Sequence, residues 1–186
     1  MSIRWVDTFT GYKEIGHIMR RIPAFALILI GLMTPVALAQ QLYTHEKVDY
    51  SFEIPSATWR TILEPDAAHE HPEFVYGDRL DGFLTIRKEV VEAGTTPSEL
   101  ARRDQDLKLR FLPGFVQGKE EAFNGRLNGV TISYEFVRTG KTMLGRTYYL
   151  QADSRTIYAL RFTGLRDKLA RIRNQTDLIA RTFKLK

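Results

Sequence analysis

The sequence predicts an α+β fold in which an antiparallel β-sheet is sandwiched by helices, after an N-terminal signal peptide. Several segments alternate apolar and polar residues with a period of two, which is typical of half-buried strands. Short turn motifs separate these segments, so that consecutive strands can pair antiparallel. Two further segments carry apolar residues at spacings of three and four, which predict amphipathic helices.

The first segment has the three parts of a secretory signal peptide. Arg20 and Arg21 precede an apolar run over 22–32, and an Ala-Leu-Ala sequence ends at Ala39. The run is shorter than the roughly 20 apolar residues of a spanning helix, so we favour cleavage between Ala39 and Gln40 over an uncleaved membrane anchor. Paired arginines are also typical of signal peptides of the twin-arginine export pathway, but the residues around them favour the general secretion pathway.

The signal peptide sets the expected domain limits. Residues 1–18 are polar and unlike the start of a signal peptide, whereas translation from Met19 gives Met-Arg-Arg and then the apolar run. We therefore expect a signal-peptide region over 1–39 with the true start at Met19, and a single domain over 40–186. Export places this domain in the periplasm, or outside a cell that lacks an outer membrane.

The strands are predicted where the alternation is clearest. They are expected at 48–54, 83–91, 130–136, 147–152 and 158–162. Tight turns are expected at Asp81-Gly82, Asn124-Gly125, Asn128-Gly129 and Thr139-Gly140. One face of the resulting sheet is apolar, so helices must cover it.

The first helix is predicted to begin after Thr96, which can cap it, with Pro97 at the first helical position and Glu99 completing a capping box. Pro113-Gly114 is expected to end it. Its predicted core face consists of Leu100, Leu107 and Phe111.

The second helix is predicted to follow Gly164 as one continuous element. Its apolar stripe consists of Leu165, Leu169, Ile172, Thr176, Ile179 and Phe183. The basic residues of this region are Arg161, Arg166, Lys168, Arg171, Arg173, Arg181, Lys184 and Lys186. Of these, Arg166, Arg171, Arg173 and Arg181 are our candidates for binding an acidic partner or anionic lipid headgroups. The simpler interpretation is the solvated outer face of a core-packing helix.

The best local cluster for metal chemistry is the loop over 66–73. His69 and His71 are two residues apart, and Asp66 or Glu73 can add oxygen ligands; imidazole with carboxylate suits Zn, Cu or Mn. A metal site needs three or four convergent ligands, and the spacing gives only two firm ones. A solvated acidic loop is therefore the simpler interpretation, and a divalent-metal site is the alternative.

Local signatures of catalysis are missing from the sequence. It contains no G-x-S-x-G, no phosphate-binding loop, no G-x-G-x-x-G and no H-E-x-x-H. With 0 cysteines, disulfides, thiolate metal sites and cysteine nucleophiles are excluded. We therefore expect a protein that is not an enzyme, and keep a hydrolase built from scattered residues as a minority alternative. The expected domain over 40–186 carries a formal net charge of +3, which is too small for a bulk nucleic-acid binder.

Motifs near both ends of the expected domain resemble the PsbP-like superfamily, which includes the photosystem II subunit PsbP and the envelope protein DcrB. The first is Tyr-Ser-Phe-Glu-Ile-Pro at 50–55 with Trp59 after it. The second is Tyr-Ala-Leu-Arg-Phe-Thr at 158–163, then a glycine and a closing helix. The resemblance implies an antiparallel sheet flanked by helices, in a protein that acts as a non-catalytic binding or assembly factor. It matches no metal ligand residue by residue.

Together these observations predict an exported, non-catalytic accessory protein of the cell envelope that binds a protein or a ligand. We expect an envelope protein as partner, no nucleic acid, no cofactor beyond the optional metal and no permanent transmembrane segment after signal cleavage. The protein is expected to be a monomer or a weak oligomer. The alternative is a periplasmic protein that binds a divalent metal through the 69–73 loop.

Overall fold

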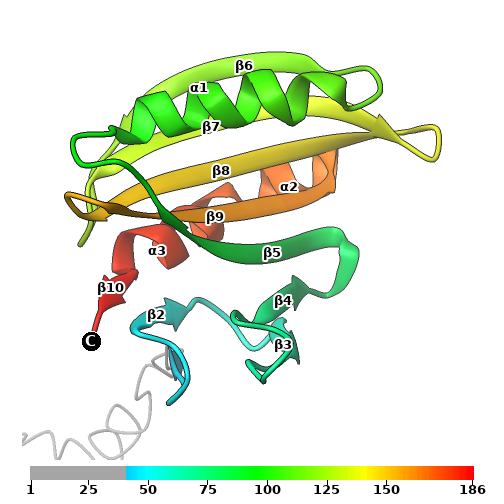
Figure 1. Cartoon of the computed structure of the whole chain (residues 1–186). Coiled ribbons are helices and arrows are strands. Elements are labelled where there is room, and N and C mark those ends of the chain that lie inside the picture. Colours follow the sequence, from blue (N-terminus) through cyan, green and yellow to red (C-terminus); the bar gives the residue numbers. More distant parts are fainter. Residues whose placement is uncertain (1–40) are drawn as a thin grey trace, which may run out of the picture. The chain divides into compact units, whose positions relative to one another are not determined.

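The strands of the computed structural model form two antiparallel sheets (Figure 1). The structure describes residues 41–186, so the predicted signal peptide, the start at Met19 and the cleavage site after Ala39 lie outside the described residues. The larger sheet contains β3 (Trp59–Leu63), β4 (Glu73–Tyr76), β5 (Asp78–Val90), β6 (Val116–Phe123), β7 (Gly129–Arg138), β8 (Lys141–Asp153) and β9 (Thr156–Leu165). Its strand order is β3-β4-β5-β9-β8-β7-β6.

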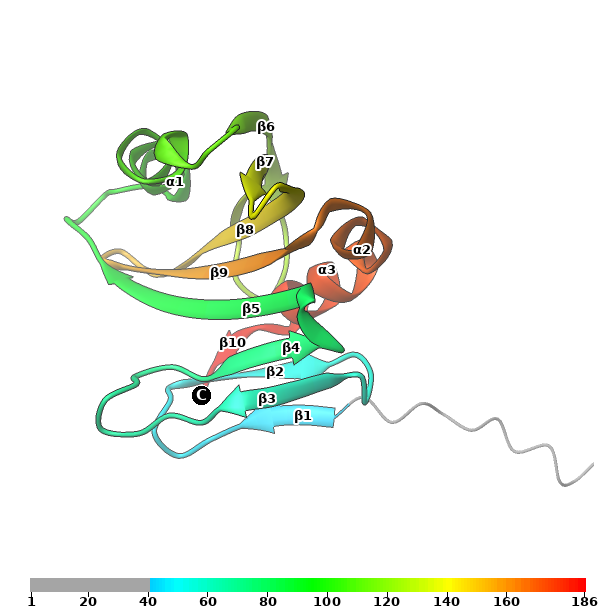
Figure 2. The ribbon, with the colours of Figure 1, turned by 90° about the vertical axis from the view of Figure 1, so that its right-hand side faces the viewer.

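The smaller sheet contains β1 (Gln41–Thr44), β2 (Tyr50–Ile54) and β10 (Lys184–Leu185), with β2 in the middle. The helices are α1 (Pro97–Leu107), the short 3₁₀-helix η2 (Leu109–Phe111), α2 (Arg166–Arg171) and α3 (Arg173–Thr182). Figure 2 shows α1 on one face of the large sheet and α2 and α3 on the other. The predicted α+β fold with a sandwiched antiparallel sheet is therefore confirmed.

Each face of the large sheet contributes to a buried core, although the sequence pattern indicates only one apolar face. Tyr148 and Leu150 of β8 pack into the core on the α3 side, which also contains aromatic residues of β2. Tyr149, the residue between them, packs into the core beneath α1. Because successive side chains of a strand point to opposite faces, an uninterrupted apolar run supplies two cores.

The start of α1 confirms the predicted capping box. The Thr96 hydroxyl accepts a hydrogen bond from the Glu99 backbone N–H at 3.2 Å, and the Glu99 carboxylate accepts one from the Thr96 N–H at 2.7 Å. The predicted core face is partly wrong, because Leu107 and Phe111 are 66% and 72% exposed. The α-helix ends at Leu107, and the tighter turn of η2 directs Leu109 inward instead.

The predicted second helix is two helices. Ile172, with φ −100° and ψ 17°, separates α2 from α3, yet Ile172, Thr176 and Ile179 are buried as the stripe predicted. Leu165 was wrongly assigned to this stripe. It is the last residue of β9, pairs with Met143 of β8 and packs against the core beneath α1.

The turn prediction at Thr139-Gly140 is confirmed, and the one at Asp81-Gly82 is wrong. Thr139 and Gly140 have φ values of 49° and 71°, as the two central residues of a tight hairpin between β7 and β8 require. Asp81-Gly82, in contrast, lies within β5. A Cβ atom at Gly82 would lie 3.0 Å from the Cδ1 of Ile172, so this glycine permits close packing rather than a turn.

The chain path over the large sheet leaves part of one face without helical cover. After β5, which pairs with β9, α1 crosses to the opposite edge, where β6 pairs with β7. The helix therefore lies over β7 and β8, while the same face of β5 and β9 lies beside it. No helix within residues 41–186 is long and apolar enough to cross a membrane.

Candidate functional site

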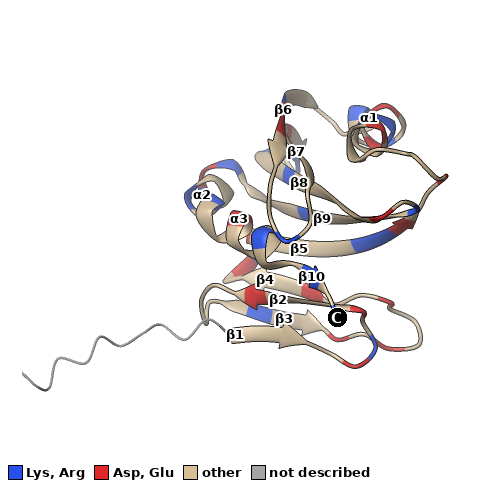
Figure 3. Ribbon diagram, turned by 90° about the vertical axis from the view of Figure 1, so that its left-hand side faces the viewer, with Lys and Arg blue, Asp and Glu red and all other residues tan. Residues whose placement is uncertain are grey.

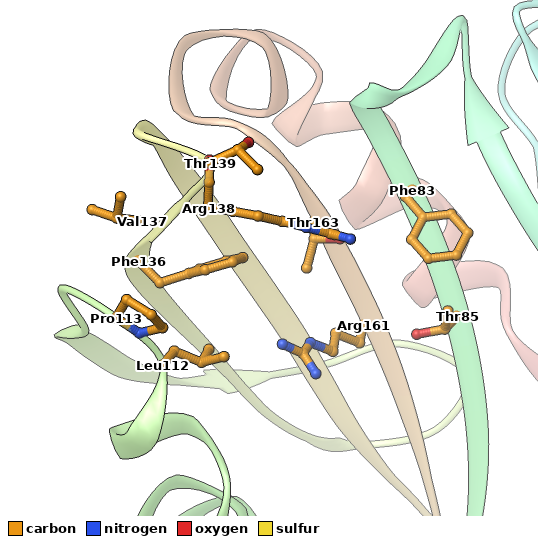
Figure 4. A pocket seen from close by; sticks show the side chains of 10 residues that line it. All are labelled: Phe83, Thr85, Leu112, Pro113, Phe136, Val137, Arg138, Thr139, Arg161 and Thr163. Carbon is orange, nitrogen blue, oxygen red and sulfur yellow. The ribbon is translucent and has the colours of Figure 1, made fainter.

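A pocket of about 500 Å³ lies on the α1 face of the large sheet, beside the end of η2 (Figure 4). We call it the Arg161 pocket; its lining residues are Phe83, Thr85, Leu112, Pro113, Phe136, Val137, Arg138, Thr139, Arg161 and Thr163. Two of them are arginines and none is acidic. The volume falls within the range of about 300–1,000 Å³ that small-molecule sites occupy.

Strand alternation builds the floor of this pocket. Leu160 of β9 faces the α3 side, so Arg161 and Thr163 face the α1 side. In the antiparallel register, Thr85 of β5 lies opposite Arg161, and Phe83 lies opposite Thr163. Two neighbouring strands therefore present one cationic, two hydroxyl and one aromatic side chain side by side.

The wall of the pocket is the segment that follows η2. The backbone N–H of Val137 donates a hydrogen bond of 2.7 Å to the carbonyl oxygen of Pro113, which ties this segment to the end of β7. Leu112 and Phe136 then line the pocket from the two sides of this junction. In Figure 4, Arg138 extends from the end of β7 towards Thr163.

The position of this wall depends on α1, which a buried carboxylate anchors to the sheet. Asp104 is 4% exposed and accepts hydrogen bonds from Tyr149 at 3.1 Å and from Arg87, and Lys108 lies 2.8 Å away. Burial by itself raises the pKa of Asp104, but Lys108 and Arg87 outweigh it, so this pKa lies below its ordinary value. Asp104 is therefore a charged anchor between α1, β5 and β8.

Arg161 is the main polar group of the pocket. The Arg161 side chain lies beside the Tyr134 hydroxyl, and its buried Nε makes no hydrogen bond of standard geometry in the described residues. Burial raises the pKa of Tyr134, while the positive charge of Arg161 and hydrogen bonding to Thr147 and Arg161 oppose this. Within residues 41–186, no carboxylate lies within ion-pair distance of Arg161 or Arg138.

An aromatic ring supports the Arg161 guanidinium group. The Arg161 Cζ lies 5.7 Å from the centroid of the Tyr134 ring, within the range of a cation–π contact. Tyr134 lies opposite Gly145, and a Cβ atom there would come within 2.2 Å of the Tyr134 Cζ. The ring can occupy this place only because residue 145 is a glycine. The arrangement suits the binding of an anionic group flanked by apolar surface.

Neither a protein-family model nor a curated protein matches this sequence. LpqN, CyanoP and Mog1p are among the solved structures that match it in shape. LpqN of Mycobacterium tuberculosis, involved in cell envelope biogenesis, is 14% identical, with 80% of this chain and 86% of LpqN covered at a TM-score of 0.53. The cyanobacterial PsbP (CyanoP) of Synechocystis is 15% identical, with 82% and 96% covered and a TM-score of 0.53.

The third structure is the Ran-binding protein Mog1p of Saccharomyces cerevisiae. It is 10% identical, with 80% of this chain and 96% of Mog1p covered at a TM-score of 0.56. The fold is PsbP-like. The resemblance predicted from the two ends of the domain is therefore confirmed as a likeness of fold. At these identities it transfers no residue's role.

The structure does not bring the four predicted metal ligands together. His69 Nδ1 lies 3.0 Å from Asp66 Oδ1, whereas His71 Nδ1 lies 3.2 Å from the Tyr50 hydroxyl. Glu73 accepts a hydrogen bond from Arg79 at 3.2 Å. In the part of the chain that the structure describes, no group of three or more His, Asp or Glu side chains is placed to hold a metal ion. The divalent-metal site stays a prediction.

The predicted arginines of the PsbP-like domain are exposed on α2 and α3, where Figure 3 shows basic segments. Arg166 lies 3.4 Å from Asp167, and Arg173 lies 3.4 Å from Glu121. Arg181 lies over the ring of Phe123, with its Cζ 5.9 Å from the centroid, and Arg171 lies at the end of α2. These four do not converge on one point, and their role in binding stays a prediction.

Proposed function

We propose that this protein is an exported, non-catalytic binding protein of the cell envelope, and that the Arg161 pocket is its binding site. The observation that carries the proposal is the pairing of an open, partly apolar pocket with two arginines that have no carboxylate within ion-pair distance in the described residues. A guanidinium group without an acidic partner is suited to bind an external anionic acceptor.

Binding is favoured over catalysis because of the residue types in the pocket. General acid–base chemistry needs a side chain that titrates near neutral pH, and the ten lining residues include no His, Asp, Glu or Lys. The threonine hydroxyls therefore have no neighbouring base within the lining to activate them.

Location in the envelope is supported by two independent observations. The first is the signal peptide that the sequence predicts at 1–39. The second is the fold shared with LpqN, a protein involved in cell envelope biogenesis. The protein would thus be exported first and meet its ligand or partner outside the cytoplasm.

Mass spectrometry of the protein exported by its own host tests this proposal. The denatured mass should correspond to a chain that begins at Gln40, and the native mass should include a bound component. Thr163→Phe, which fills the pocket floor and leaves both arginines in place, should lose that component. A native mass equal to the denatured mass in both proteins contradicts binding in the pocket, and an intact N-terminus contradicts export.

A further inference from the structure

The charge of the Arg161 pocket selects for acidic ligands. Its ten lining residues carry two positive charges and no negative one, so a negatively charged headgroup meets no repulsion from the lining. A guanidinium group binds carboxylate and phosphate oxygens through parallel N–H donors, and it does so most strongly where water is partly excluded. Arg161 meets this condition because its Nε is buried.

The remaining surface of the pocket is apolar. Phe83, Phe136 and Leu112 line it together with Pro113 and Val137. Phe111, the residue before Leu112 in the chain, is a further apolar side chain that is 72% exposed. A simple inorganic anion would leave this surface in water, whereas a ligand with a hydrocarbon portion would bury it.

We propose that the Arg161 pocket takes an amphiphilic anion, whose carboxylate or phosphate headgroup pairs with Arg161 while its apolar tail lies against Phe83, Phe136 and Leu112. This inference rests on the proposed function, because it names the ligand class of the same site. Arg138, which extends over the pocket from the end of β7 in Figure 4, adds a second positive charge near the entrance.

Calorimetric titration of the exported protein with four probes tests the inference. Decanoate and decyl phosphate carry the tail with different acidic headgroups, decanol carries the tail alone, and acetate carries the acid alone. We expect one of the two acidic amphiphiles to bind at least about tenfold more tightly than decanol and acetate, because a charge-assisted pair is added. The preferred headgroup then distinguishes a carboxylate source from a phosphate source.

Matched variants locate the binding. Arg161→Gln should weaken the preferred amphiphile about 10- to 100-fold. Arg171→Gln, which removes the same charge from α2 on the opposite face of the sheet, should leave the affinity unchanged. Circular dichroism checks that both variants fold. If Arg161→Gln does not fold, the unaltered protein still tests the inference. Its affinities for the acidic amphiphiles and for decanol are then compared, with Thr163→Phe as the variant whose pocket is blocked.

The outcomes separate the two proposals. If decanol and both acids bind with equal affinity, and Thr163→Phe abolishes this binding, the proposed amphiphilic anion is overturned. The pocket then remains a binding site. If Arg171→Gln lowers the affinity and Arg161→Gln does not, both proposals are overturned, because the ligand then binds at the surface of α2. Failure of every probe to bind overturns the amphiphilic anion, and the native mass of the exported protein then tests the pocket independently.

Discussion

Replacing Asp104 with asparagine should loosen α1 and destabilise the fold. The carboxylate is 4% exposed and accepts from the Tyr149 hydroxyl and the Arg87 guanidinium, with the Lys108 ammonium group 2.8 Å away. Asparagine keeps one oxygen acceptor but removes the charge, so it cannot serve all three donors. Because the wall of the Arg161 pocket follows α1, the same change should weaken ligand binding there.

The size of the effect follows from the exposure of the three donors. Tyr149 is 1% exposed, and a buried hydroxyl deprived of its charged acceptor costs about 1–3 kcal/mol. The Arg87 and Lys108 side chains are 39% and 55% exposed, so water can replace the carboxylate and each adds only about 0–1 kcal/mol. We therefore expect Asp104→Asn to lower the free energy of unfolding by about 1–5 kcal/mol.

Urea denaturation followed by the fluorescence of Trp59, which is 4% exposed, measures this loss. Tyr149→Phe is the matched control: it removes one donor and keeps the charge, and should cost about 0.5–1.5 kcal/mol. The double variant should cost less than the sum of the two single changes, because both remove one contact. A loss below about 0.5 kcal/mol for Asp104→Asn would refute the view that this carboxylate anchors α1.

The pH dependence gives an independent check on Asp104. Its pKa in the folded protein is lower than in the unfolded chain, so the unfolded chain binds more protons in acid. The stabilisation is complete above the unfolded pKa of about 3.9 and is lost as the pH falls through the lower, folded value. Asp104→Asn should therefore show a shallower loss of stability below about pH 4 than the unaltered protein.

Three further predictions concern the pocket floor and the 66–73 loop. Gly145→Ala should displace the Tyr134 ring and cost about 1–3 kcal/mol in urea denaturation, whereas no measurable loss would show that the ring is not confined there. Burial lowers the pKa of His71 below 6.5, so stability should fall as the pH drops below about 6.5. His71→Asn should reduce this dependence of stability on pH. An unchanged pH dependence contradicts the lowered pKa of His71. Because His69 and His71 have different partners, Zn²⁺ should not raise the unfolding temperature; a rise lost in the double alanine variant would instead establish the metal site.

The elements that the sequence predicted well are those whose cause is local. The Thr96-Pro97 start of α1 and the Thr139-Gly140 hairpin are each determined by a few adjacent residues. Where the prediction failed, tertiary packing decides. Ile172 keeps the helical spacing of the apolar stripe while the backbone breaks there, and β9 extends through Leu165 because β8 pairs with it.

The Arg161 pocket depends on the order of the strands in the sheet. This order cannot be derived from the spacing of apolar residues in the sequence. Its place in the chain groups Arg161 with the basic residues of the closing helix, although strand alternation places it on the opposite face of the sheet. Arg161 stands between Leu160 and Phe162, and this alternation indicates that one face of the strand accepts a polar side chain. That α1 lies over β7 and β8 and leaves part of β5 and β9 uncovered follows only from the order in which the strands pair.

The most direct test of the account is an NMR titration of the arginine Nε–Hε groups in the exported protein with decanoate. Arg161 lines the pocket, so a headgroup bound there should shift its resonance strongly. The resonances of Arg171 and Arg166, on the other side of the sheet, should stay unchanged. An unmoved Arg161 resonance together with shifts at Arg166 or Arg171 would contradict the account and place anion binding on α2.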